Sequence, residues 1–91
     1  MALWYHIRYY DEGVPRTDRL IAKIRGRPPE AEFTDVRHLL ERFDWKLDRQ
    51  RGSHFIFVKS GAPTISVPKT NHDKVKRTYL DRICELLGLD D

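Results

Sequence analysis

The chain has 91 residues, of which 40% are hydrophobic and 34% charged, so it holds enough apolar material for one modest core and argues against a second domain. Its single cysteine, Cys84, excludes an intramolecular disulfide, and no spacing of cysteine and histidine fits a structural zinc site. No apolar run approaches the roughly 20 residues that span a bilayer, and the first residues lack the basic and then apolar order of a signal peptide. We therefore expect a soluble protein of the cytoplasm that does not associate with membranes.

The net charge of +3 is unevenly distributed along the chain. Residues 44–80 carry eight basic and three acidic residues, whereas the rest of the chain carries nine basic and eleven acidic residues. Such a basic segment suits a polyanionic partner, because lysine and arginine neutralise phosphates and release their condensed counterions. It is equally compatible with a solvated surface that has no partner.

The first thirty residues are predicted to form an N-terminal extension with one short helix. Residues 1–10 are rich in aromatic side chains and could form a strand, which residues 11–15 would end. Thr17 could cap a helix with Leu20, Ile21 and Ile24 on one side, ended by Gly26 and two prolines. We place the domain boundary after residue 30 and expect residues 31–91 to form the main domain.

The main domain is predicted to begin with a helix. Thr34 is a plausible N-cap, and Val36, Leu39, Leu40 and Phe43 follow at the spacing of one helical face. From residue 45 the apolar period changes to two, which is typical of a half-buried strand, and residues 50–52 are predicted to form a turn.

Two more strands and a closing helix complete the expected domain. In residues 53–59, Phe55 and Phe57 would face one side, with His54 and Ile56 on the other. Residues 64–67 are predicted to form a third strand. The closing helix is expected to bury one side, formed by Val75, Tyr79, Ile83 and Leu86 or Leu87. Gly88 suits the left-handed cap at its end. Short turns favour an antiparallel meander, so we expect a two-layer α+β domain of the order α-β-β-β-α, with the helices on one face of a three-stranded sheet.

Four segments, residues 34–43, 48–57, 65–68 and 80–89, together resemble the HicA family throughout. The most specific of them contains Arg-Gln-x-Gly-Ser-His-x-x-Phe, which starts at Arg49 and ends at Phe57. HicA proteins are toxins of bacterial and archaeal toxin–antitoxin pairs. The resemblance implies a fold like that of the double-stranded-RNA-binding domain, endoribonuclease activity on mRNA, and neutralisation by a HicB-type antitoxin protein.

The sequence also departs from the family pattern. Many members have a second histidine where this chain has Phe55, and a histidine where it has Thr70. His72 lies two residues beyond Thr70 and could substitute for that histidine. The usual Gly-Thr-Leu before the last helix is replaced by residues 77–80.

The chemistry expected of such a site centres on His54, which the resemblance implies is the catalytic residue. An imidazole, with an ordinary pKa near 6.5, can take a proton from the 2′-hydroxyl of RNA at neutral pH. No acidic cluster suited to Mg²⁺ lies in the strands, so we expect a metal-independent reaction with no cofactor. The residues predicted to bind the RNA are Arg49, Arg51, Ser53, Lys59, Lys69, Lys74 and Arg77.

Two other interpretations remain open. The chain could be an RNA-binding module of the same fold without catalysis, since Phe55 and Thr70 replace histidines. It could instead be an interaction protein whose aromatic residues 4–10 contact a partner or a second copy. We expect Trp45, Phe55 and Phe57 to pack in the core rather than to stack on bases, and Ser53 to stabilise the turn rather than to act as a nucleophile.

Overall fold

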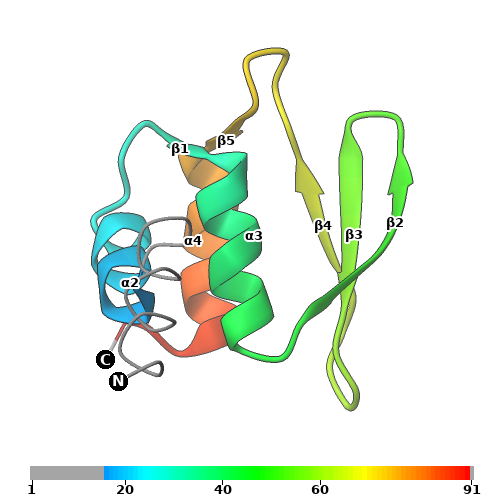
Figure 1. Cartoon of the computed structure of the whole chain (residues 1–91), viewed down its shortest axis with the longest axis horizontal. Helices are drawn as coiled ribbons and strands as arrows, with labels where there is room; N and C mark the ends of the chain where they lie inside the picture. Colours follow the sequence, from blue (N-terminus) through cyan, green and yellow to red (C-terminus); the bar gives the residue numbers. More distant parts are fainter. Residues whose placement is uncertain (1–15, 91) are drawn as a thin grey trace, which may run out of the picture.

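The structure, a computed structural model, describes residues 16–90. Its elements in chain order are α2 (Thr17–Arg25), β1 (Glu30–Glu32), α3 (Phe33–Arg42), β2 (Lys46–Arg51), β3 (His54–Val58), β4 (Ile65–Pro68), β5 (Lys74–Lys76) and α4 (Arg77–Leu87) (Figure 1). The predicted strand within residues 1–10, together with the aromatic residues and His6 in it, lies outside the described residues. None of the described helices is long and apolar enough to cross a membrane.

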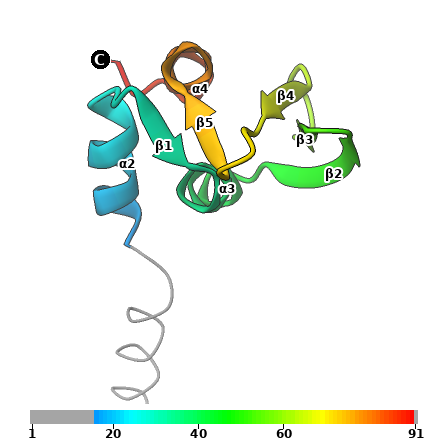
Figure 2. The same ribbon diagram turned by 90° about the horizontal axis from the view of Figure 1, so that it is seen from above.

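The expected α+β architecture is confirmed. Strands β2, β3 and β4 form an antiparallel sheet in that order, and α2, α3 and α4 lie together on one side of it (Figures 1 and 2). Phe55, Phe57 and Val67 face the helices and belong to the main core, as does Trp45 just before β2. The prediction that these aromatic side chains pack in the core is therefore confirmed.

A second sheet of two short strands was missed by the sequence analysis. Strands β1 and β5 pair antiparallel, with Ala31 opposite Val75 and charged residues on either side. Val75 is fully buried in β5, so the prediction that it belongs to the closing helix was wrong. A strand of three residues is too short to display a two-residue period, which is why the sequence could not distinguish it from the start of the helix.

The buried face of α4 also differs from the prediction. Tyr79 is exposed, and the buried residues are Leu80, Ile83 and Cys84. These residues and Leu87 are spaced as well for one helical face as the predicted set, so periodicity alone could not choose between them. Gly88 does adopt the predicted left-handed cap conformation, with φ of 67°.

Both predicted N-caps are displaced by one residue or more. Helix α2 begins at Thr17 with Arg16 as N-cap, and α3 begins at Phe33 with Glu32 as N-cap. Neither N-cap side chain makes a capping hydrogen bond to the backbone of its helix, and Phe33 follows β1 directly. Strand pairing therefore sets the start of α3, and the Thr34 hydroxyl does not.

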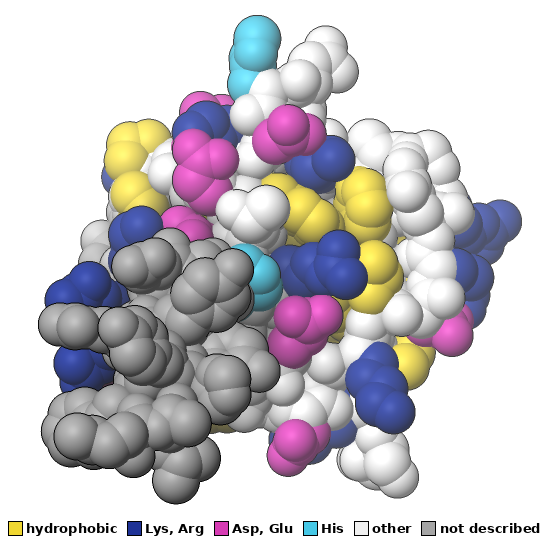
Figure 3. All heavy atoms as spheres, viewed as in Figure 1, with side chains coloured by type: hydrophobic (Ala, Val, Ile, Leu, Met, Phe, Trp, Pro, Cys, Tyr) yellow, Lys and Arg dark blue, Asp and Glu magenta, His cyan; other side chains and the backbone are white. Residues whose placement is uncertain are grey.

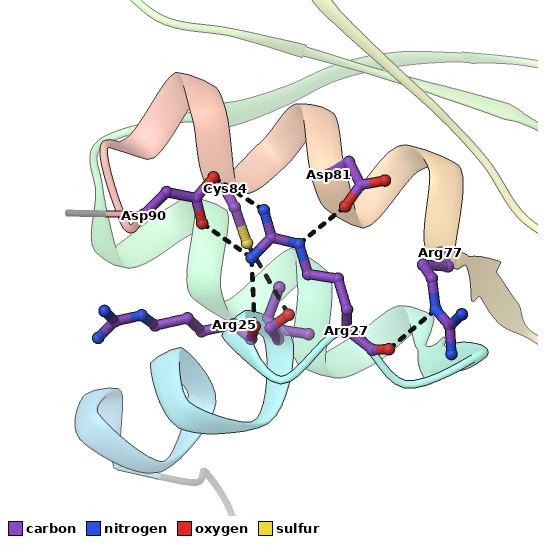
Figure 4. A network of polar contacts seen from close by, with 7 residues as sticks. Arg25, Arg27, Arg77, Asp81, Cys84 and Asp90 are labelled. Atoms are coloured by element: carbon purple, nitrogen blue, oxygen red, sulfur yellow. Dashed lines mark hydrogen bonds and ion pairs between the residues drawn. The ribbon is translucent and has the colours of Figure 1, made fainter.

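Helix α2 packs into the same core as the rest of the molecule, since Leu20 and Ile24 are fully buried in the main cluster. Arg27 anchors the segment that follows: its guanidinium donates to Asp81 at 2.8 Å and to Asp90 at 2.8 Å, while its carbonyl oxygen accepts from Arg77 Nε at 2.9 Å (Figure 4). The two carboxylates raise the pKa of Arg27, and Arg27 lowers the pKa of Asp90. The ion pairs tie the segment between α2 and β1 to the first half of α4 and to the residues just beyond its C-terminal end.

Candidate nucleic-acid interface

The face of the β2–β3–β4 sheet that points away from the helices carries the candidate site, and we call it the outer face. Strand pairing defines three rows of neighbours on it. The row at one end of the strands contains Arg51, His54 and Pro68, and the middle row contains Arg49, Ile56 and Ser66. The remaining row pairs Lys46 with Val58.

A bulge at Asp48 turns two arginines toward this face. Leu47 pairs with the core residue Phe57, but the next pair joins Arg49 to Ile56, so β2 holds one extra residue at this point. In a regular strand Arg49 would lie on the same face as Leu47, because alternate side chains share a face. The extra residue reverses this alternation and places Arg49 and Arg51 on the face of His54.

This arrangement differs from the prediction. Gln50 and Arg51 were expected in a turn, whereas β2 continues through Arg51 and the turn consists of Gly52 and Ser53. An aspartate in the middle of an alternating segment gives no signal for a bulge that single-sequence periodicity could detect. The bulge follows from the pairing of β2 with β3.

His54 is exposed at the first position of β3, directly after the tight turn. Gly52 has φ of 60°, a conformation that suits glycine, and its carbonyl oxygen accepts from Gln50 Nε2 at 2.9 Å. The carbonyl oxygen of Ser53 accepts from the N–H of Lys69 at 2.9 Å. The first hydrogen bond fixes the turn to β2, and the second fixes it to the residue that follows β4. Together they fix the backbone position of His54.

One side-chain contact orients the imidazole. His54 Nδ1 lies 3.2 Å from the hydroxyl oxygen of Ser66 on the neighbouring strand. The other ring nitrogen, Nε2, makes no hydrogen bond to residues 16–90. Ser66 was not predicted as a site residue, although its position between Ile65 and Val67 would have placed it on the face opposite the core.

The cations of β2, and Lys59 directly after β3, leave much of their charge available. Arg49 pairs with the adjacent Asp48 at 2.6 Å and is still more than half exposed. Lys46, Arg51 and Lys59 form no ion pair with any residue in the described part of the chain. Figure 3, viewed as Figure 1, shows lysine and arginine side chains along the side of the molecule where β2 lies.

The charged groups of three other predicted RNA-binding residues, Lys69, Lys74 and Arg77, are bound to protein groups away from the outer face. Lys69 Nζ lies 5.2 Å from the ring centroid of Phe33, 4.9 Å from that of Phe55 and 3.0 Å from Asp73. Both rings belong to the core, so the ammonium group lies on the helical side of the sheet.

Lys74 and Arg77 belong to the smaller sheet and to α4. Lys74 is paired with Glu32 across the β1–β5 sheet, and this hydrogen bond raises its pKa. Arg77 donates to the carbonyl oxygen of Arg27. The structure therefore brings together Arg49, Arg51, Ser53 and His54, with Lys59 just beyond the far end of β3. It does not bring the charged groups of Lys69, Lys74 and Arg77 to them.

The other described histidines do not join His54. His72 lies in the loop between β4 and β5, where its backbone N–H donates to the Thr70 hydroxyl, and no described contact links it to His54. His38 lies on α3, and its Nδ1 is buried without a hydrogen-bond partner among the described residues. No group of three or more histidine, cysteine, aspartate or glutamate residues in the described range could hold a metal ion.

Comparison with known proteins identifies one family. No curated protein and no solved structure matches the chain. The family described as HicA toxin of bacterial toxin–antitoxin matches residues 33–89, which run from α3 to just beyond α4 and include the whole β2–β3–β4 sheet. More than half of the chain is covered, including the outer face and the helices behind it, and the chain therefore belongs to the HicA toxin family.

Proposed function

We propose that the chain is the toxin of a type II toxin–antitoxin pair and acts as an endoribonuclease that cuts mRNA with His54. The observation that carries the proposal is the exposed imidazole of His54, which shares the outer face with Arg49 and Arg51 and has Nε2 free of described protein contacts. Membership of a toxin family supports a toxic activity. The chemistry of these side chains indicates which activity it is.

The reaction uses a nucleophile that RNA itself carries. His54 takes the proton of a 2′-hydroxyl through Nε2, and the 2′-oxygen attacks the adjacent phosphorus. The bond from phosphorus to the 5′-oxygen breaks, the 5′-oxygen leaves with a proton from water, and a cyclic 2′,3′-phosphate remains. Arg49 and Arg51 stabilise the extra negative charge that develops on the phosphate oxygens.

Binding of the RNA is assigned to the same face. Ser53 offers its hydroxyl in the turn beside His54, and Lys59 extends the positive charge along the sugar–phosphate backbone. RNA binding by Lys69, Lys74 and Arg77 stays a prediction, because their charged groups contact protein atoms on the helical side of the molecule. The reaction as proposed needs no metal ion or other cofactor.

The substitution of Phe55 for a histidine does not weaken this proposal. The Phe55 side chain is buried and packs against Phe33, with ring centroids 4.5 Å apart. Position 55 therefore faces the helices, opposite to His54. Thr70 holds its loop through its hydroxyl, which accepts from the backbone N–H groups of His72 and Lys74.

The same proposal includes a HicB-type antitoxin that inhibits the toxin in the cytoplasm. The family is one of toxin–antitoxin systems, which implies a cognate antitoxin. Co-expression with the neighbouring gene should restore growth to cells that the toxin arrests. Continued arrest in the presence of that gene product would contradict its assignment as the antitoxin.

The proposal is tested by comparing purified wild type with His54→Ala on RNA in the presence of EDTA. We expect His54→Ala to cut at least about 100-fold more slowly, because general acid–base catalysis contributes that much. Its affinity for RNA should change little, since the arginines remain. A His72→Ala variant should lose less activity than His54→Ala, because His72 lies in a separate loop.

Two outcomes would contradict the enzyme. If wild type binds RNA without cutting it, and its expression neither arrests growth nor depletes mRNA, the chain is a non-catalytic RNA-binding module. If EDTA abolishes cleavage while His54→Ala retains it, a metal-dependent site elsewhere carries the reaction.

A further inference from the structure

Ser66 occupies a specific place relative to the imidazole of His54. His54 is paired with Pro68, and Ser66 lies two residues before Pro68 on β4, so the two side chains are diagonal neighbours on the outer face. Their contact joins Nδ1 to the hydroxyl oxygen at 3.2 Å. The pairing of Ser66 with Ile56 holds its backbone in place.

We propose that Ser66 is a positioning residue that accepts a hydrogen bond from Nδ1–H of His54 and so presents the unprotonated Nε2 to the substrate. This inference rests on the proposed function, in which His54 receives the 2′-hydroxyl proton. The nitrogen of a histidine that carries the proton is determined by the hydrogen bond of the other nitrogen. Ser66 would thus select one of the two neutral forms of the ring.

The direction of the hydrogen bond follows from the two protonation states that catalysis requires. If Ser66 accepts from Nδ1–H, its bond persists when Nε2 gains the substrate proton, because a protonated imidazole donates from both nitrogens. If Ser66 donated to Nδ1 instead, the only basic nitrogen would be covered by the serine. Nε2 would then carry a proton and could not act as a base.

The other neighbours of His54 cannot fill this role. Arg51, opposite His54 on β2, carries only donors and cannot accept from an imidazole N–H. Pro68, opposite on β4, has no polar side-chain atom. Within residues 16–90, Ser66 makes the side-chain hydrogen bond to this ring.

The experiment measures the protonation of each ring nitrogen of His54 by ¹⁵N NMR at a pH where the ring is neutral, in the full chain and without RNA. In wild type we expect the form protonated at Nδ1 to predominate. In Ser66→Ala it should become the minor form, and Ser66→Thr, which keeps the hydroxyl on a strand-forming residue, should restore it. Ser60→Ala, in the turn beyond the other end of β3, is the matched control and should resemble wild type.

Cleavage assays on the same variants provide a second measurement. Loss of one hydrogen bond predicts that Ser66→Ala cuts RNA about three- to tenfold more slowly, with recovery in Ser66→Thr. An unchanged ratio of the two ring forms in Ser66→Ala, or a wild-type ring protonated mainly at Nε2, would overturn the inference. A wild type that cuts no RNA would contradict the proposed function. The ratio of the two ring forms measured by NMR would still show whether Ser66 accepts a hydrogen bond from His54.

Discussion

Basic side chains are held differently in the helical half of the molecule and on the outer face of the β2–β3–β4 sheet. In the helical half, ion pairs join separate elements: Lys23 contacts Asp35 between α2 and α3, and Lys74 contacts Glu32 between β5 and β1. On the outer face, Arg51 has no ion-pair partner in the described residues. The first set of charges contributes to the fold, and the second is available to a ligand.

This difference qualifies the charge excess of residues 44–80. The excess includes Lys69, Lys74 and Arg77, whose charged groups all contact protein atoms on the helical side. A count along the sequence cannot separate these side chains from those of β2. The positive charge of residues 44–80 is therefore larger than the positive charge that is available to bind RNA. A cation is available only if its charged group is not already bound to a protein group.

The largest expected effect is a loss of stability when a side chain is removed from the core that joins α2 to the rest of the helical half. Leu20 is fully buried, so Leu20→Ala should lower the free energy of unfolding by about 2–5 kcal/mol. Arg19→Ala, on the exposed side of the same helix, should stay within about 0.5 kcal/mol of wild type. Urea unfolding measures both, and equal stabilities of the two variants would show that α2 contributes little to the core.

A smaller effect distinguishes the two sets of cations. Arg51→Gln should weaken RNA binding and reduce the salt slope of the affinity by about 0.7, the value for one phosphate contact to a single strand. The matched control is Arg82→Gln on α4, where Arg82 lies 3.9 Å from Glu85. Titrations at several salt concentrations measure both slopes, and an equal reduction in the two variants would show that the outer face has no special role.

Much of this fold could be predicted from the sequence because its longer elements have clear periods. The spacing of Val36, Leu39 and Leu40 identified α3, and all three are buried. The alternation from His54 to Val58 placed the two phenylalanines toward the helices and His54 away from them, as observed. These predictions depend on local patterns that extend over at least five residues.

The features that were missed depend on pairing between distant segments. Val75 belongs to β5 because β1 lies beside it, and Arg49 reaches the outer face because β2 pairs with β3 around a bulge at Asp48. Ser66 on β4 contacts His54 on β3, the neighbouring strand. Each of these placements requires the register of the strands, which periodicity within one strand does not determine.

The smallest predicted effect concerns the ion pair that ties the segment after α2 to the C-terminal end of α4. Arg27 lowers the pKa of Asp90 below its ordinary value of 3.8, mainly through their hydrogen bond. A carboxylate with a lowered pKa stabilises the fold above its unfolded pKa, and this contribution is lost as the pH falls through the lowered value. Asp90→Asn should therefore be slightly less stable than wild type at neutral pH and should lose less stability between pH 3.8 and more acidic conditions.

Urea midpoints measured as the pH is lowered test this expectation, with Glu85→Gln on α4 as an exposed carboxylate control. The control should follow the wild-type pH dependence, because Glu85 lies 3.9 Å from Arg82 and has no closer ion pair. An Asp90→Asn variant with the same acid dependence as wild type would show that the Arg27 pair does not stabilise the fold. Because Asp90 is solvent-exposed, the effect should weaken further in high salt, whereas the loss in Leu20→Ala should persist there.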